Sequence, residues 1–191
     1  MDYQTTLGVI AVLIGFAGYA VYFRGIFKGE IKPHAFSWLV WAILTTIGFL
    51  AQVEGGGGPG AWVTGFTALM SYVLVFIGIG ASSRALIKRS DWLYFIASLL
   101  AIPPWYLTGD PLWSVVIVTV IDTIAFVPTF RKAYEHPETE SLFHASCAAV
   151  KFLFGIAALG TFSLTTVLYP ASLVLANGAF VLMLYFRRRS A

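Results

Sequence analysis

Seven long apolar stretches, separated by short polar breaks, constrain this chain more than any other feature of its sequence. A helix needs about 20 residues to cross the hydrocarbon core of a bilayer, and each stretch comes close to that length. The stretches lie near residues 7–23, 35–53, 61–80, 92–107, 112–130, 142–161 and 164–186. Only 11% of the residues are charged, against about 25% in soluble domains. The sequence therefore predicts an all-α membrane protein with seven transmembrane helices.

Basic residues occupy every second break between these stretches. Short loops rich in Lys and Arg stay in the cytoplasm, so the pattern predicts an external N-terminus and a cytoplasmic C-terminus. Of the 12 basic residues, 11 lie on the side predicted to be cytoplasmic: Arg24, Lys28, Lys32, Arg84, Lys88, Arg89, Arg131, Lys132, Arg187, Arg188 and Arg189. The net charge of +3 then indicates topology and contact with lipid headgroups, with no nucleic acid partner.

The chain also contains a weak internal repeat, which is a common feature of transporters. A shift of 107 positions aligns residues 9–48 with residues 116–155 without a gap. Phe23 and Arg24 then coincide with Phe130 and Arg131. The repeat predicts two parallel three-helix bundles, residues 1–81 and 111–191, joined by a linker helix in residues 82–110. The second bundle carries the basic C-terminal tail.

This architecture resembles the SWEET and PQ-loop superfamily of small-solute transporters. The best local match is residues 126–132 (Phe-Val-Pro-Thr-Phe-Arg-Lys), followed by residues 138–141 (Glu-Thr-Glu-Ser), which look like a PQ-loop signature. Thr129 replaces the glutamine of that signature, and the first half has Val21 and Tyr22 at the equivalent pair, without a proline. The resemblance implies a SWEET-like fold and a solute cavity between the bundles, near the bilayer midplane.

Asp122 and Lys151 are the charged residues near the middle of predicted membrane helices. An ionised group there costs about 2.5–3.5 kcal/mol on insertion scales, so it is retained when something uses or neutralises it. Two interpretations stay open. The residues form a structural ion pair, or they serve transport as a substrate counter-charge or as a proton carrier, as a membrane aspartate does in some similar PQ-loop transporters.

Polar and aromatic residues mark one face of two predicted helices. Their spacing of three and four residues places them on a common face, which in a membrane helix points toward a cavity or a helix interface. The first helix carries Ser37, Trp38, Trp41, Thr45 and Gly48, and the second carries His144, Ala148, Lys151 and Gly155. An indole ring suits stacking on a sugar or on a cation. An interfacial aromatic belt is the alternative for the tryptophans, and it is favoured for Trp38.

Asn177 lies inside an apolar run, where its amide needs partners that lipid cannot supply. The SWEET resemblance implies a substrate-binding asparagine in this last helix, and Ser71 lies near the equivalent position of the first half. A simple interhelical hydrogen bond is the alternative. Pro128 and Pro170 interrupt backbone hydrogen bonds and are predicted hinges, whereas the Pro103-Pro104 pair predicts a kink in the linker helix.

The sequence thus favours a carrier of a small polar solute such as a sugar, either passive or proton-coupled, in the plasma membrane of a prokaryote. Its partners are the solute and the lipid bilayer, with a homo-oligomer left open. We expect no enzyme activity, no cofactor and no metal site, since the histidines are scattered and no phosphate-binding loop is present. The alternatives are a seven-helix receptor or photoreceptor and a non-transporting subunit of a membrane complex.

Overall fold

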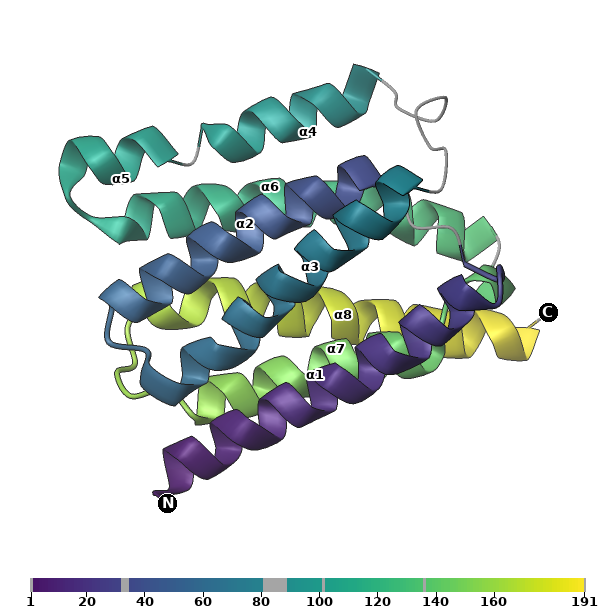
Figure 1. Ribbon diagram of the computed structural model, residues 1–191, viewed down its shortest axis with the longest axis horizontal. Helices are drawn as coiled ribbons and strands as arrows, with labels where there is room; N and C mark the ends of the chain where they lie inside the picture. The colour runs from purple at the N-terminus through teal and green to yellow at the C-terminus, as the bar shows by residue number, and fades with distance from the viewer. Residues whose placement is uncertain (1, 32–34, 81–88, 101, 136, 191) are drawn as a thin grey trace.

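The protein is all-α in the part of the chain that the computed structural model describes, which is residues 2–31, 35–80, 89–100, 102–135 and 137–190 (Figure 1). The helices are α1 (Tyr3–Phe27), α2 (Ala35–Glu54), α3 (Trp62–Gly80), α4 (Arg89–Leu99), α5 (Ile102–Thr108), α6 (Pro111–Glu135), α7 (Leu142–Ala157) and α8 (Leu164–Ser190), with short 3-10 helices η1 (Gly58–Ala61) and η3 (Pro137–Thr139). Since α4 and α5 together form one broken helix, the described residues contain the seven predicted helices.

Five helices are long and apolar enough to cross a membrane: Tyr3–Phe27, Ser37–Glu54, Gly58–Gly78, Pro111–Glu135 and Leu164–Arg189. The other two predicted spans are shorter than expected. The linker is divided into α4 and α5, and Pro103 and Pro104 lie in the first turn of α5, where the missing amide protons are tolerated. Helix α7 has 16 residues and ends ahead of Gly160. The fold is that of a multi-span membrane protein.

Large apolar side chains point outward at helical spacing on three of the long helices. Such an exposed apolar belt would be a liability in water and is what a lipid-facing surface requires. Its members are Val9, Leu13 and Phe16 on α1, Val120, Ile124 and Val127 on α6, and Leu175, Leu182 and Phe186 on α8. The outward faces of these helices are therefore suited to contact acyl chains.

The inward face of α1 consists mainly of small residues, including Gly8, Ala11, Gly15 and Gly18. A Cβ atom at Gly18 would lie 2.8 Å from the Cβ of Cys147 on α7, which is too close. Membrane helices pack tightly through such residues because apolar burial gives no driving force between helices in lipid. The small face of α1 thus explains its extensive packing against α7.

Local capping explains where several helices begin. Asp2 precedes α1, and its carboxylate accepts a hydrogen bond of 2.7 Å from the Thr5 amide. Hydrogen bonds from the Thr5 side chain and backbone lower the pKa of the Asp2 carboxyl, which lies outside the helix. Asp110 precedes α6, and its Oδ1 accepts from the Leu112 amide at 2.9 Å. Ser141 caps α7 in the same way, with His144 N at 3.2 Å.

The helices pack in a regular pattern of neighbours. Helix α2 lies against α3 and α6, α7 lies against α8 and α1, and α6 also lies against α8. The broken helix α4–α5 covers the outer side of α2 and α6 (Figure 1). Most of the buried core therefore forms among α1, α2, α3, α6, α7 and α8.

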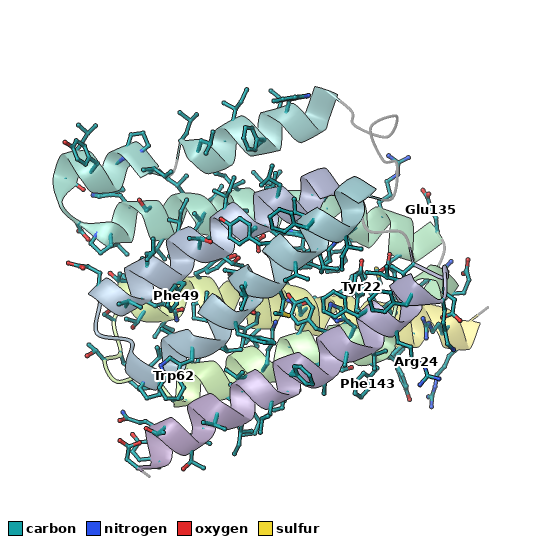
Figure 2. All side chains as sticks on the ribbon, viewed as in Figure 1. Tyr22, Arg24, Phe49, Trp62, Glu135 and Phe143 are labelled. Atoms are coloured by element: carbon teal, nitrogen blue, oxygen red, sulfur yellow. The ribbon has the colours of Figure 1, made fainter. Side chains whose placement is uncertain are left out.

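The two ends of the helix bundle differ chemically. We call one the basic end, because it contains Arg24, Arg131, Arg187, Arg188 and Arg189 at the last turns of α1, α6 and α8. The opposite, glycine-loop end contains the N-terminus and residues 55–60 and 158–163. Figure 2 shows Arg24, Glu135 and Phe143 at the basic end, and Phe49 and Trp62 toward the other.

Candidate functional site

A cavity of about 170 Å³ lies among α1, α2, α3, α6, α7 and α8. That volume is enough for several water molecules or one small solute. The cavity runs from the middle of these helices to Glu140 and Ser141, just ahead of α7 at the basic end. Tyr22, which borders the cavity, is labelled near this end in Figure 2.

Most residues that the sequence singles out for the site do line this cavity. They are Trp38, Trp41, Ser71, Asp122, His144, Lys151 and Asn177. Ser37 is different: it is half-buried at the start of α2 and lies outside the lining. The sequence favours a position in the interfacial aromatic belt for Trp38, whereas the structure places it in the cavity lining with 9% of its surface exposed. The structure brings these side chains together, and their roles in binding stay predictions.

The two predicted hinge residues are placed within helices. Pro170 is buried inside α8, directly after the cavity residue Tyr169. Pro128 lies in α6, between the cavity residues Phe126 and Thr129. Both prolines remove a backbone donor near the cavity, and their hinge function stays a prediction.

Lys151 enters the cavity from α7 and is 3% exposed. Its ammonium donates a hydrogen bond of 2.8 Å to Thr67 Oγ1 on α3. It also lies 4.9 Å from the ring centroids of Tyr19 and Phe152, a cation–π distance. Within the described residues no carboxylate oxygen lies within 4.0 Å of this ammonium. The lysine is thus surrounded by a hydroxyl and two aromatic rings.

Asp122 lies on α6, is 2% exposed and also lines the cavity. The Trp41 side chain on α2 lies beside it. Lys151 Nζ is more than 4.0 Å from its carboxylate, so the direct ion pair required by the structural interpretation is not formed in this structure. Within the described residues the aspartate likewise has no other lysine or arginine within that distance.

Tyr169 on α8 completes the polar lining beside Asp122. The tyrosine side chain is fully buried, and its hydroxyl has no hydrogen-bond partner among the described residues. An unsatisfied buried hydroxyl costs about 1–3 kcal/mol, so a polar ligand or water that reaches it would be favoured. The ring itself packs against Gly48, where an added Cβ would clash with Tyr169 Cδ1.

Aromatic rings form one wall of the cavity toward the basic end. Trp38 lies 5.5 Å from Tyr22 and 5.1 Å from Trp41, measured between ring centroids. His144 lies 5.0 Å from Tyr22 and 5.4 Å from Tyr19, and its Nδ1 is 3.1 Å from Gly18 O. These edge-on and tilted contacts hold the rings in defined positions without filling the cavity.

Several polar side chains that line the cavity form hydrogen bonds to the backbone of their own helix. Asn177 Nδ2 donates to Leu173 O at 2.8 Å, and Ser71 Oγ donates to Thr67 O at 2.8 Å. Both bonds run to the carbonyl four residues earlier, a common solution for polar side chains in membrane helices. Since an amide has further donor and acceptor capacity, Asn177 can still bind a solute.

The glycine-loop end closes the cavity on one side. Gly160 N donates to Gly57 O at 3.0 Å, and Gln52 Nε2 donates to Thr166 O at 3.0 Å. The loop reaches this position through left-handed backbone at Gly56 and Gly58, which favours glycine. The first bond joins the α2–α3 and α7–α8 connections, and the second joins α2 to α8. The cavity lining contains no residue of either connection, so the cavity is closed toward this end.

Sequence reasoning missed several residues of the site, among them Tyr19, Thr67 and Tyr169. Tyr169 and Thr67 carry ordinary polar groups within apolar runs, and nothing in their spacing distinguishes them from other hydroxyl residues. Their importance comes from the side chains that face them across a helix interface. The bulk of Tyr169 opposite Gly48 is the one signal that a search for paired large and small residues could have found.

Comparison of the chain with protein-family models, with curated proteins and with solved structures gives no match. Within the described residues, no group of three or more His, Cys, Asp and Glu side chains is placed to hold a metal ion.

Proposed function

We propose that this protein is a membrane carrier that moves a small polar solute by alternating access between two three-helix bundles. The observation that carries the proposal is the cavity itself, which reaches the middle of the helices and contains the buried charges of Asp122 and Lys151. Buried ionisable groups facing a cavity inside a membrane protein commonly mark a solute or ion pathway. Closure at one end only is the arrangement that a carrier adopts in one of its states.

The packing pattern supports the internal repeat on which this mechanism rests. Exchanging α1, α2 and α3 for α6, α7 and α8 maps each contact onto another: α2–α3 onto α7–α8, α1–α3 onto α6–α8, and α1–α7 onto α2–α6. In such a repeat, related by an axis along the membrane normal, the solute site lies at the interface of the halves.

Two glycines support the same correspondence at the level of residues. Gly48 on α2 contacts Tyr169 on α8, and Gly155 on α7 contacts Val63 on α3. The glycines differ by 155 − 48 = 107 positions and their partners by 169 − 63 = 106 positions. A shift of 106 also places Ser71 on Asn177, since 177 − 71 = 106. Each of these two residues donates to the carbonyl four residues earlier, and they line the cavity from α3 and α8.

The orientation in the membrane belongs to this proposal: the basic end faces the cytoplasm, because short basic loops resist translocation. We expect Phe162→Cys to react with an impermeant thiol reagent on intact cells, and Lys28→Cys to react only after permeabilisation. Both positions are exposed, at the glycine-loop and basic ends respectively. The labelling uses a Cys147→Ala background, which removes the native thiol. Labelling with the opposite sidedness would reverse the assignment.

Trp41 offers the most direct test of solute transport. Its ring contacts Trp38 and Phe126 and its side chain is a neighbour of Asp122, so its removal opens the aromatic wall. We expect Trp41→Ala to lower solute uptake into proteoliposomes at least about tenfold, a factor that corresponds to about 1.4 kcal/mol of binding. Labelled glucose, glycine, γ-aminobutyrate and uridine provide the first panel of solutes. Asn177→Ala should lower uptake of the same solute.

The matched control is Trp113→Ala, which removes an exposed tryptophan from the first turn of α6. This variant should transport like the parent protein. If Trp41→Ala and Asn177→Ala also transport normally, the cavity is not the solute site. If the parent protein moves no solute but co-purifies stably with another membrane protein, it is a packing subunit instead.

A further inference from the structure

We propose that the solute is a small zwitterion, with its carboxylate bound at Lys151 and its ammonium bound at Asp122, Trp41 and Tyr169. The inference rests on the proposed carrier function and names the class of solute. It follows from the placement of two opposite charges that line one cavity without forming an ion pair.

The Lys151 side of the cavity is built to bind an anion. An ammonium has three N–H donors, and within the described residues the Lys151 ammonium donates one hydrogen bond, to Thr67 Oγ1. The Tyr19 and Phe152 rings hold the charge from two other directions without supplying a counter-ion. The Thr67 hydroxyl donates its own proton to Val63 O at 2.7 Å and accepts from Lys151, which fixes its direction. The free donors of the ammonium are therefore available to a ligand carboxylate.

The Asp122 side is built to bind a cation. A carboxylate can accept several hydrogen bonds, and the Trp41 side chain lies beside this one. The buried hydroxyl of Tyr169, which is without a partner in the described part of the chain, borders the same region. A ligand ammonium there would donate hydrogen bonds to the Asp122 carboxylate and to the Tyr169 hydroxyl oxygen. It would also make a cation–π contact with the Trp41 ring.

A zwitterion satisfies both charges at once and leaves the net charge of the cavity unchanged. A sugar would offer hydroxyl groups but no counter-charge, so both buried charges would remain unneutralised. A simple cation or anion would neutralise one charge only. The cavity of about 170 Å³ admits a compact solute, such as an amino acid with a short side chain.

Ligand-induced stabilisation of the purified full-length protein tests this assignment, because a bound ligand raises the melting temperature by mass action. The probes are glycine, alanine and γ-aminobutyrate as zwitterions, alaninamide as the cation without a carboxylate, N-acetylalanine as the anion without an ammonium, and glucose as the neutral solute. We expect at least one zwitterion to bind ten or more times more tightly than alaninamide, N-acetylalanine and glucose.

Two variants assign the ends of the ligand. Lys151→Met should remove the preference for alanine over alaninamide, and Asp122→Asn should remove the preference for alanine over N-acetylalanine. Lys151→Arg keeps the charge and should keep the preference for the zwitterion, which a purely structural role of the lysine would not predict. The controls are Val150→Met and Thr123→Ala, neighbours in sequence whose side chains are exposed and outside the cavity.

The outcomes separate the two proposals. Tight binding of glucose with no zwitterion bound, or an unchanged charge preference in Lys151→Met and Asp122→Asn, overturns the zwitterion assignment and leaves the carrier standing. If no probe binds and none is taken up into proteoliposomes, both proposals fail.

Discussion

Gly60→Ala should destabilise the protein by about 3 kcal/mol, at the upper end of the usual range for overpacking. A Cβ atom at this position would lie 2.5 Å from Gly155 O, 2.7 Å from Leu159 N and 2.8 Å from Leu159 Cα. All three are backbone atoms, so no side-chain rotation can make room. The substitution must therefore separate η1 from the end of α7. Thermal unfolding of the purified protein in detergent measures the effect.

Gly178→Ala is the matched control for this prediction. Gly178 lies within α8, and among the described residues no heavy atom beyond its chain neighbours and the nearby backbone of its own helix lies within 4 Å of the Cβ that alanine would add. Alanine is favoured over glycine in a helix by about 0.8–1.0 kcal/mol, so this variant should be slightly more stable than the parent. Equal melting temperatures for the two variants would mean that the connections at the glycine-loop end do not pack as the structure has them.

The helices could be predicted because each one is encoded by its own apolar stretch of sequence. A run of about 20 apolar residues has few other stable structures, and the predicted stretches coincide with the observed helices within a few residues. The lengths were less predictable. The sequence prediction extended the sixth span to residue 161, but α7 ends at Ala157, and the Gly160 amide bonds to Gly57 O on the opposite connection. That contact depends on the packed fold.

The candidate site could be predicted in part for the same reason. Trp41 and His144 can be predicted because residues three or four apart share a helix face, which is a property of one helix alone. Thr67 and Tyr169 could not be predicted because their partners lie on other helices. The sequence of one helix does not determine which of its residues face a residue of another helix. Ser37 shares the predicted face of Trp41 but is not among the residues that line the cavity, so its role in binding stays a prediction.

Removing the two buried charges should leave a folded protein, singly and together. Asp122→Asn and Lys151→Met each remove a charge whose burial in the membrane costs about 2.5–3.5 kcal/mol. Because the two residues form no direct ion pair, neither substitution leaves the other residue without a partner that it had before. We therefore expect each single variant to melt at or above the temperature of the parent. Such a gain, combined with lost solute binding, is the usual relation between stability and activity at a functional site.

The double variant decides between this account and a structural ion pair. If the charges act independently, the stability changes of the single variants should add, with a coupling free energy below about 1 kcal/mol. A structural ion pair predicts a different cycle: each single variant loses about 3–5 kcal/mol because one charge is stranded, and the double variant regains most of that loss. Unfolding free energies of the four proteins in the same detergent measure the coupling directly. A large rescue in the double variant would show that Asp122 and Lys151 hold the bundles together, and it would remove the argument that each charge is available to a solute.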